Sequence, residues 1–238
     1  MKHPLLSSLV LITAIGFIAE SGSVLADGGT YLNPEQIDLG ELLAPPPALG
    51  SEAQKDDLAR VLEVQRERTP EEVSRARGDV EKSVFRFSDV LGAAFNEKNL
   101  PQTAALFDAA AKEAELVAKS GKRYFKRPRP FVTSSDVHPI VLTSPKGAYE
   151  SYPSGHATFG YMTAILLSRM VPEKRAEIFA RGREFGENRV VDGVHYPSDV
   201  EAGRIEGTLI ADALMANPEF RRNFFVAKSE VRTALGLN

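Results

Sequence analysis

One short stretch of the chain combines an anion-binding backbone with a proton donor: Tyr152-Pro153-Ser154-Gly155-His156. An apolar run over 157–171 follows it, so we expect Ser154 to be the N-cap of a helix whose first turn holds Gly155 and His156. The first N–H groups of a helix have no partner inside it, and with the helix dipole they attract an anion. Ser154 adds a hydroxyl group, Gly155 permits close approach, and His156 adds a proton donor. The stretch predicts an anion site that includes a general acid.

A second stretch, 122–129, holds five basic residues in eight positions. Lys122 and Arg129 are seven residues apart, and Pro130 stiffens the chain after them. Lysine offers a point charge, whereas the planar fork of arginine binds two phosphate oxygens at once. Taken alone, such a stretch is more typical of a solvated basic surface. Whether these basic residues bind an anion therefore depends on the other two stretches.

The third stretch runs from Arg189 to Asp199 and pairs a histidine with a carboxylate. His195 and Asp199 are four residues apart across an expected helix start. This spacing allows the carboxylate to accept the Nδ1–H of the imidazole, which leaves the Nε2 lone pair pointing outward, as in a catalytic triad. A purely structural His–Asp hydrogen bond is the alternative.

The same residue types could also collect a metal ion. The candidate ligands for zinc or magnesium are His138, His156, His195, Asp192 and Asp199. No HExxH helix or other close ligand spacing supports this alternative. We therefore expect no metal and no other cofactor.

Helical periodicity dominates the rest of the chain. Helices are expected over 51–68, 69–96, 99–121, 155–171, 172–185, 198–215 and 220–235, with capping boxes at Thr69 and Ser198 and a stop at Gly236. The segments 122–151 and 188–197 are expected to be loops. Only 131–133, 140–143 and 189–191 have any strand character, so the predicted class is all-α.

The N-terminus resembles a secretory signal. Lys2 precedes an apolar region over 5–19, and Val24-Leu25-Ala26 has small residues at the two positions a signal peptidase reads. We predict a signal peptide over 1–26, an irregular proline-rich arm over 27–50, and one helical domain over 51–238. The protein would be periplasmic or secreted, with no membrane anchor after cleavage; an uncleaved anchor is the alternative.

Composition excludes several kinds of chemistry. The net charge of −3 gives no general attraction for nucleic acid. The absence of cysteine excludes disulfides, thiol catalysis and lipoprotein anchoring. The 212 residues that would follow cleavage suffice for one substantial core.

Together, the three stretches resemble the three-part signature of the type 2 phosphatidic acid phosphatase superfamily, which also contains the vanadium haloperoxidases. The signature residues are Lys122 with Arg129 and Pro130, then Pro153 to His156, then Arg189 with His195 and Asp199. The segments YFKRPRPF, SYPSGH and DVEAGR are similar to segments of bacterial class A non-specific acid phosphatases. This resemblance implies a single-domain helical bundle that hydrolyses phosphomonoesters without a metal.

The resemblance also implies a role for each signature residue. His195 would be the nucleophile that forms a phosphohistidine, Asp199 would orient it, and His156 would protonate the leaving alcohol. The non-bridging oxygens would be held by Lys122, Arg129, Ser154, Gly155, His156 and Arg189. An acid pH optimum is expected, and an alcohol that replaced water would give phosphotransferase activity.

Three departures from the family pattern stand out. Asn188 takes the place of a serine before Arg189, Ala157 takes the place of a threonine after His156, and the cysteine pair common before the second motif is missing. We expect these changes to tune activity and to loosen the loop over 134–151. Small phosphomonoesters are the expected partners, and the resemblance suggests self-association through apolar residues over 84–95 or 220–235.

Three alternatives stay open at this point. A vanadate-dependent haloperoxidase would use the same residues to bind vanadate, although the chain is short for one. A lipid phosphatase usually has several membrane spans, and no second span is evident here. A non-catalytic phosphate-binding protein would explain the cations and the helix start, but not the spacing of His195 and Asp199.

Overall fold

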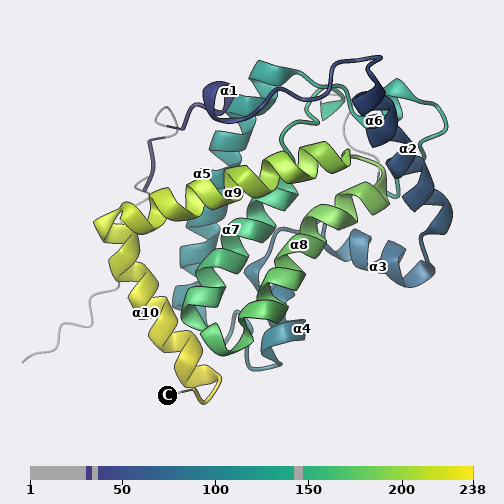
Figure 1. Ribbon diagram of the computed structural model, residues 1–238. Coiled ribbons are helices and arrows are strands. Elements are labelled where there is room, and N and C mark those ends of the chain that lie inside the picture. The colour runs from purple at the N-terminus through teal and green to yellow at the C-terminus, as the bar shows by residue number, and fades with distance from the viewer. Residues whose placement is uncertain (1–30, 34–36, 142–146, 238) are drawn as a thin grey trace, which may run out of the picture.

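The computed structural model describes residues 31–33, 37–141 and 147–237, and within these ranges every regular element is a helix (Figure 1). The expected all-α helical bundle is confirmed. The predicted signal peptide, 1–26, lies outside the described residues and stays a prediction. The elements are α1 (Leu39–Leu42), α2 (Glu52–Glu67), α3 (Pro70–Gly78), the 3₁₀ turn η2 (Val84–Phe87), α4 (Ser88–Leu91), α5 (Pro101–Phe125), α6 (Pro130–Thr133), α7 (Gly155–Met170), the 3₁₀ turn η4 (Pro172–Lys174), α8 (Arg175–Asp192), α9 (Pro197–Ala216) and α10 (Pro218–Ala234).

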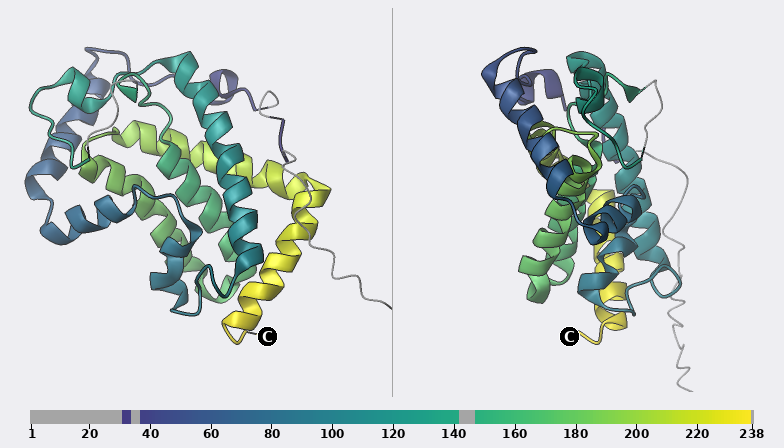
Figure 2. Two further views of the ribbon diagram at one scale, coloured as in Figure 1. Left: turned by 180° about the vertical axis from the view of Figure 1, so that it is seen from behind. Right: turned by 90° about the vertical axis from the view of Figure 1, so that its right-hand side faces the viewer.

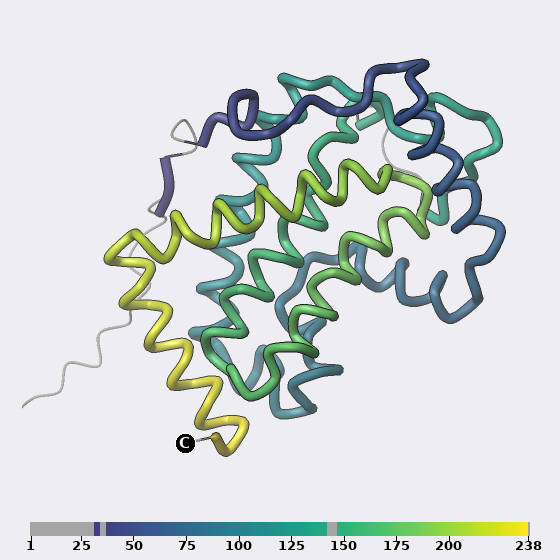
Figure 3. The backbone as a smooth tube through the Cα atoms, viewed as in Figure 1, coloured from purple at the N-terminus to yellow at the C-terminus, as the bar shows by residue number. Residues whose placement is uncertain are grey.

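Helix α7 forms the centre of the bundle and packs against both α8 and α9. Figure 3 shows α9 crossing the start of α7. A Cβ at Gly203 would lie 2.4 Å from the Ser154 carbonyl oxygen, and one at Gly207 would lie 2.5 Å from that of Thr158. Only glycine therefore allows α9 to approach the first turn of α7 this closely. This contact brings two of the three signature stretches together.

The remaining long helices surround this centre. Helix α5 packs against α7 and α10, and it comes to the front when the molecule is seen from behind (Figure 2). Helices α2 and α3 pack against α8 on the other side. Among the described residues, no helix is both long and apolar enough to cross a membrane.

The helix predicted over 69–96 is wrong beyond its first part. The capping box at Thr69 opens α3 as expected, but α3 ends at Gly78, and the chain continues through a turn, η2 and α4. The cause is a long-range interaction, because the buried carboxylate of Asp79 is bound by Arg181 of α8. The apolar side chains downstream still reach the core: Val84, Phe87, Leu91 and Phe95 are all buried. They are therefore not available for the self-association suggested above, unlike Phe225 of α10, which is 57% exposed.

Two helices are longer than predicted. Helix α5 continues to Phe125, and α8 continues to Asp192, where Gly193 adopts a left-handed conformation (φ 83°) that ends the helix. The segments 131–133 and 189–191, which have strand character, are both helical: 189–191 is buried at the end of α8, whereas 131–133 forms the single turn of α6 that Pro130 opens. In consequence, Lys122 and Arg189 lie in last helical turns and not in loops.

The start of α9 differs from the prediction. Its N-cap is Tyr196 and not Ser198, and Pro197 occupies the first helical position. Asp199 is thus the third residue of the helix, and its Oδ2 accepts a hydrogen bond from the Tyr196 N–H at 2.9 Å. The last helix begins at Pro218, two residues before the predicted Phe220, because the Asn217 side chain caps it.

The described part of the N-terminal arm is irregular except for the single turn of α1. The carbonyl oxygen of Ala44 accepts a hydrogen bond of 2.6 Å from the Tyr152 hydroxyl group. This bond ties the arm to the stretch that precedes α7. The arm therefore supports the segment from which the proposed general acid extends.

Candidate active site

The three signature stretches meet where four helix ends converge. The C-terminal ends of α5 and α8 and the N-terminal ends of α7 and α9 lie in the upper half of Figure 1. The Ser154 N–H donates to the Asp199 carbonyl oxygen at 3.0 Å, and the Ser151 N–H donates to that of Arg127 at 3.1 Å. Residues far apart in the sequence are thus joined by backbone hydrogen bonds at one end of the bundle.

His195 is 2% exposed and is contacted on both ring nitrogens. Its Nδ1 lies 3.3 Å from Asp199 Oδ2, and its Nε2 lies 3.1 Å from Arg129 Nη1. A guanidinium group can only donate, so Nε2 must offer its lone pair and the proton must be on Nδ1. The neighbours therefore select the neutral tautomer, in which the Nε2 lone pair faces Arg129. Burial, followed by the charges of Arg129 and Lys122, holds the pKa of His195 well below its ordinary value of 6.5.

Asp199 is fully buried, and both of its carboxylate oxygens are used. Oδ2 accepts from the Ser151 hydroxyl group at 2.6 Å and from the Tyr196 N–H at 2.9 Å, besides facing His195. Oδ1 accepts from Arg127 Nη1 at 2.6 Å. Burial raises the pKa of Asp199, and the charge of Arg127 opposes this rise. Hydrogen bonds from Ser151, Tyr196 and Arg127 thus fix the position of the carboxylate beside the His195 imidazole.

Arg127 is a residue whose role the sequence left unassigned. It is 3% exposed, and its guanidinium carbon lies 4.1 Å from the centre of the Tyr196 ring. Its remaining hydrogen bonds run to side chains of α2 and α9: Gln54 at 2.6 Å, Asp57 at 2.8 Å and Ser198 at 2.6 Å. The only local signal is its place within the basic stretch, and that signal does not separate it from exposed Arg123.

We expect Arg127→Lys to lower kcat about 10²-fold, because small displacements of a catalytic constellation cost about this much. A lysine keeps the charge but lacks the fork that reaches Asp199, Ser198, Gln54 and Asp57 together. The inhibition constant of inorganic phosphate should change little, since these partners already occupy the guanidinium group. Steady-state kinetics would test this, with Arg123→Lys as the matched control. A large loss of phosphate affinity with unchanged kcat would contradict the positioning role.

Lys122 and Arg129 form the cationic wall beside His195. Lys122 Nζ donates to the Glu150 carbonyl oxygen at 2.6 Å, and Arg129 donates to the carbonyl oxygens of Gly147 and Val194, both at 2.7 Å. Within the described ranges, no carboxylate lies within salt-bridge distance of either cation. Burial is the main cause that lowers the pKa of Lys122 to about 8 and that of Arg129 to about 10. A bound anion would relieve this excess of positive charge.

Arg189 is the third cation and is 3% exposed. Its Nη1 lies 3.0 Å from Asp192 Oδ2 within the last turns of α8. Burial lowers its pKa, and the charge of Asp192 counteracts this effect. Asp192 also accepts a hydrogen bond from the Val141 N–H at 2.8 Å, so it serves as a structural partner of this helix end.

The start of α7 has the geometry of an anion site. Ser154 is the N-cap, and its hydroxyl oxygen lies 3.4 Å from the Ala157 nitrogen. Helix geometry leaves the N–H groups of Gly155 and His156 without an intrahelical partner. A Cβ at Gly155 would meet no atom within 4 Å, so open space lies in front of this turn. A tetrahedral anion can therefore reach the backbone here.

His156 is partly exposed, and its Nε2 lies 3.0 Å from the Val80 carbonyl oxygen. A carbonyl group only accepts, so this Nε2 carries the proton. Burial is the main cause that lowers the pKa of His156 well below 6.5, followed by the charge of Arg189, and the hydrogen bond to Val80 opposes both. The two imidazoles are thus held in opposite states at Nε2.

Two residues considered at the sequence level lie elsewhere. Asn188 donates to Asp79 Oδ2 at 2.8 Å inside a buried ion-pair cluster and does not join the cations. His138 is exposed, and its backbone makes its hydrogen bonds in the described structure: the N–H donates to Gln65 at 2.6 Å and the carbonyl oxygen accepts from Arg68 at 3.2 Å. In the described part of the chain, no cluster of three histidine, aspartate or glutamate side chains could hold a metal ion.

Glu206 lies beneath the anion site and is fully buried. Its Oε2 is 2.7 Å from the Thr158 hydroxyl oxygen, which is itself 3.0 Å from the Ser154 carbonyl oxygen. A hydroxyl group has a single proton, so both contacts are satisfied only if Glu206 is protonated and donates to Thr158. Burial raises the pKa of Glu206 to about 8, in agreement with this arrangement.

We expect Glu206→Gln to remove a pH dependence of stability. The folded-state pKa of about 8 lies above the ordinary value of 4.5, so the stability of the wild type is fully present below pH 4.5 and is lost as the pH rises through about 8. The loss is at most about 1.4 kcal/mol per pH unit. A glutamine amide donates to Thr158 at every pH. Urea unfolding of both proteins at mildly acidic and mildly alkaline pH would test this; parallel curves would contradict it.

Comparison with known proteins agrees with this site. The family model of the PAP2 superfamily matches residues 105–222. The chain is 33% identical over 207 residues to a non-specific acid phosphatase of Providencia stuartii, covering 83% of this chain and 82% of that protein. It is 35% identical over 156 residues to a non-specific acid phosphatase of Salmonella typhimurium, covering 64% of this chain and 62% of that protein. An acid phosphatase of Zymomonas mobilis is 32% identical over 199 residues, covering 81% and 75% of the two chains.

A solved structure shares the fold. A bacterial vanadium-dependent iodoperoxidase superposes with a TM-score of 0.59 at 17% identity, covering 73% of this chain and 52% of that one. The chain therefore spans about half the length of this structural neighbour. At this identity the likeness concerns the fold alone.

The chain belongs to the PAP2 superfamily. Within it, the chain is a member of the group of bacterial non-specific acid phosphatases. The family and the enzyme class indicated by the three signature stretches are thereby confirmed.

Proposed function

We propose that this protein is an acid phosphatase that hydrolyses phosphomonoesters through a phosphohistidine at His195. The observation that carries the proposal is the opposite state of the two imidazoles at Nε2. Arg129 donates to His195 Nε2, which therefore has a lone pair, and Val80 accepts from His156 Nε2, which therefore has a proton. One histidine is prepared to attack and the other to donate, as acid–base catalysis with two groups requires.

In the first step, the Nε2 lone pair of His195 forms a bond to phosphorus while the bond to the ester oxygen breaks. His156, as the imidazolium, gives a proton to that oxygen and becomes neutral, so the product leaves as an alcohol. The positive charge that develops on His195 is stabilised by Asp199 at Nδ1. In the second step, neutral His156 removes a proton from water, which attacks phosphorus and releases inorganic phosphate and His195.

The cations stabilise the transferring group. Charge spreads over the three equatorial oxygens in the transition state, so positioned donors contribute most of the catalysis. Lys122, Arg129 and Arg189 would hold these oxygens together with the hydroxyl group of Ser154 and the N–H groups of Gly155 and His156. Because no carboxylate neutralises Lys122 or Arg129 in the described residues, the anion itself would supply the missing charge.

The pKa values of the two imidazoles support an acid optimum. Both pKa values lie well below 6.5, chiefly because of burial and then because of the arginines beside each ring. These low pKa values keep His195 neutral, and so able to attack, down to acid pH, and they confine the protonated form of His156 that can donate to the same acid range. Since kcat/KM reports the free enzyme, it should decline toward neutral pH. A maximum on the alkaline side would contradict the assignment of His156.

The same intermediate permits transfer to other acceptors. An alcohol that takes the place of water would attack the phosphohistidine, with His156 again accepting the proton, and a new ester would form. Small soluble phosphomonoesters are the proposed substrates, and the export signal predicted over 1–26 would place the enzyme in the periplasm or outside the cell. These points extend the proposal beyond the family assignment.

The decisive experiment follows p-nitrophenyl phosphate hydrolysis in mildly acidic buffer with excess EDTA. We expect activity to persist, and rapid quenching into alkali, which preserves phosphohistidine, should yield a protein heavier by one phosphoryl group at His195. Loss of activity in EDTA would favour a metal site. Turnover without any phosphorylated protein would favour direct attack by water.

A further inference from the structure

Asp79 is a buried carboxylate that the proposed reaction does not use. It is 0% exposed and follows the last residue of α3. Arg181 donates to both of its oxygens, at 2.6 and 2.8 Å, Asn188 donates at 2.8 Å, and Arg86 donates at 3.1 Å. Burial acts to raise the pKa of Asp79, but the hydrogen bonds and charge of Arg181 outweigh it, so the pKa is lowered. Asp79 is therefore a charged group held firmly against α8.

The next residue touches the active site through its backbone. The Val80 side chain is 39% exposed, so packing does little to hold it. Its carbonyl oxygen nevertheless lies 3.0 Å from His156 Nε2. One peptide unit and the two torsions of Val80 separate this carbonyl group from Asp79, and the Val80 N–H is itself held by the Arg77 carbonyl oxygen at 3.4 Å, so the anchoring of Asp79 restricts where the carbonyl group lies.

We propose that Asp79 is a positioning residue for His156: its bonds to Arg181 and Asn188 place the Val80 carbonyl group, which holds the imidazole with a proton on Nε2. The proposal rests on the role of His156 as general acid. The end of α3, a helix with no signature residue, would thus help to keep His156 protonated until the alcohol leaves.

In this proposal Asn188 helps to hold the Asp79 carboxylate. A serine, the usual residue of the family at this position, is shorter, whereas the asparagine amide extends to Asp79. Asn188 directly precedes Arg189 in the last turns of α8. One helical turn therefore carries both a cation for the phosphoryl group and an anchor for the general acid.

The Val80 carbonyl group works against the cations around His156. Arg189 of α8 and Lys82 of the following loop both favour loss of the His156 proton, as does a charge on His195. The hydrogen bond to Val80 favours its retention. If the carbonyl group moved, His156 would hold its proton less firmly and its ring could turn away from the leaving oxygen.

The test compares two substrates that differ in their need for an acid. An alkyl phosphate releases a strongly basic alkoxide that needs a proton, whereas p-nitrophenyl phosphate releases a weakly basic phenolate that needs little help. We expect Asp79→Asn to lower kcat/KM about tenfold more for the alkyl ester than for the aryl ester, a fraction of the about 10²–10⁴ that a general acid contributes. Equal losses on both substrates would overturn the proposal.

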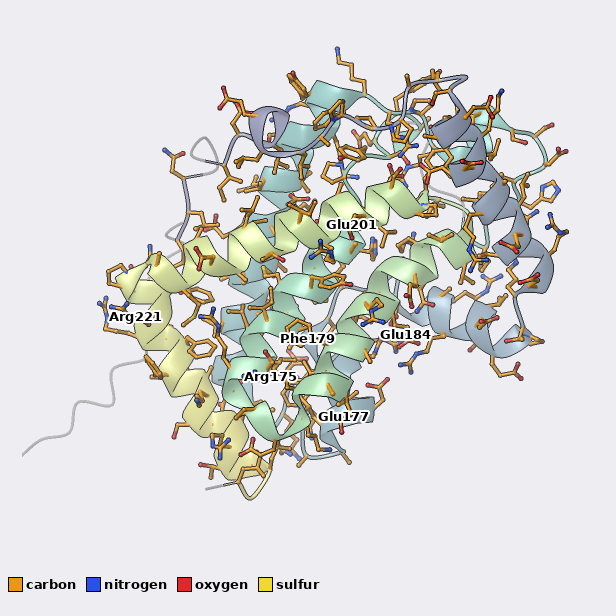
Figure 4. The ribbon with its side chains drawn as sticks, in the orientation of Figure 1. Arg175, Glu177, Phe179, Glu184, Glu201 and Arg221 are labelled. Carbon is orange, nitrogen blue, oxygen red and sulfur yellow. The ribbon has the colours of Figure 1, made fainter. Side chains whose placement is uncertain are left out.

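A second, milder variant keeps the proposal testable if Asp79→Asn does not fold. Asn188→Ala removes one bond to Asp79 but keeps the ion pair with Arg181, and we expect a smaller shift of about threefold in the same direction. The matched control is Arg75→Gln, which breaks the ion pairs of α3 with Asp89 and with Glu184 of α8 (labelled in Figure 4) but replaces no side chain bonded to Asp79. A leaving-group effect of the same size in Arg75→Gln would show that general loosening of α3 is responsible, and it would overturn the proposal.

His156→Ala separates this inference from the proposed function. If His156→Ala shows no selective loss on the alkyl ester, the general-acid assignment itself fails. If it shows the loss but neither Asp79→Asn nor Asn188→Ala does, the function stands and the positioning role is wrong. Two-bond ¹H–¹⁵N spectra of the imidazoles provide a direct readout, since the Nε2-protonated tautomer of His156 should weaken in Asp79→Asn.

Discussion

Replacement of His195 by alanine should reduce kcat/KM for p-nitrophenyl phosphate by about 10⁵-fold or more, the scale seen when a nucleophile is removed from a catalytic constellation. The alanine has no lone pair to attack phosphorus, and the neighbouring Arg129 and Lys122 can only donate. What remains is stabilisation of the transition state for slow attack by water. No phosphorylated protein should be detected after an alkaline quench.

Loss of activity in this variant is informative only if the site remains assembled. The side chains proposed to bind the anion do not depend on His195 for most of their contacts, since Lys122 and Arg129 are held by backbone carbonyl groups. Vanadate and inorganic phosphate should therefore still bind, as measured by calorimetry. The matched control is His138→Ala, which removes an exposed histidine and should keep full activity. A loss smaller than about 10⁴-fold in His195→Ala would contradict the nucleophile assignment, because loss of general acid–base assistance alone accounts for about 10²–10⁴-fold.

Local signals predicted much of this fold. Ser154 as an N-cap and the capping box at Thr69 act over three or four residues, and each opens a helix where expected. The extension of α8 to Asp192 also had a local signal, because a glycine such as Gly193 typically ends a helix. The prediction of a loop over 188–197 did not take this glycine into account.

The interactions that local signals missed span large separations in the sequence. Periodicity continued through Asp79, yet α3 stops there because Arg181, 102 residues away, captures the carboxylate. Arg127 likewise binds Asp199 across 72 residues and Asp57 across 70. A buried ion pair costs desolvation and forms only when the fold supplies its partners, so no window of sequence can reveal it.

This distinction explains why the candidate site was predictable and its supports were not. The residues proposed to touch the phosphoryl group lie in short motifs, whose spacing reflects helix ends. The residues inferred to position them are Arg127, Ser151 and Asp79, and their segments come together only when α5 packs against α7 and when α2 and α3 pack against α8. Predictions that concern these supports therefore test the structure beyond the motif.

The second large effect is expected for Asp199→Asn, in which kcat should fall about 10³–10⁴-fold, as when the aspartate of a catalytic triad loses its charge. The hydrogen bonds leave the amide no acceptable orientation. If the NH₂ group replaces Oδ1, it faces the donor Arg127; if it replaces Oδ2, it faces the Ser151 hydroxyl group and the Tyr196 N–H. His195 would then lose the acceptor that keeps its proton on Nδ1.

The same substitution should destabilise the protein by about 3 kcal/mol, because it leaves a buried cation with fewer compensating charges. Asp57→Asn is the matched control, since Asp57 is the other acidic partner of Arg127 but does not contact His195. We expect it to lower stability similarly while reducing kcat less than tenfold. Urea unfolding and kinetics on both variants separate the two effects. If Asp57→Asn lowered kcat as far as Asp199→Asn, the ion-pair cluster as a whole would matter and not the bond from Asp199 to His195.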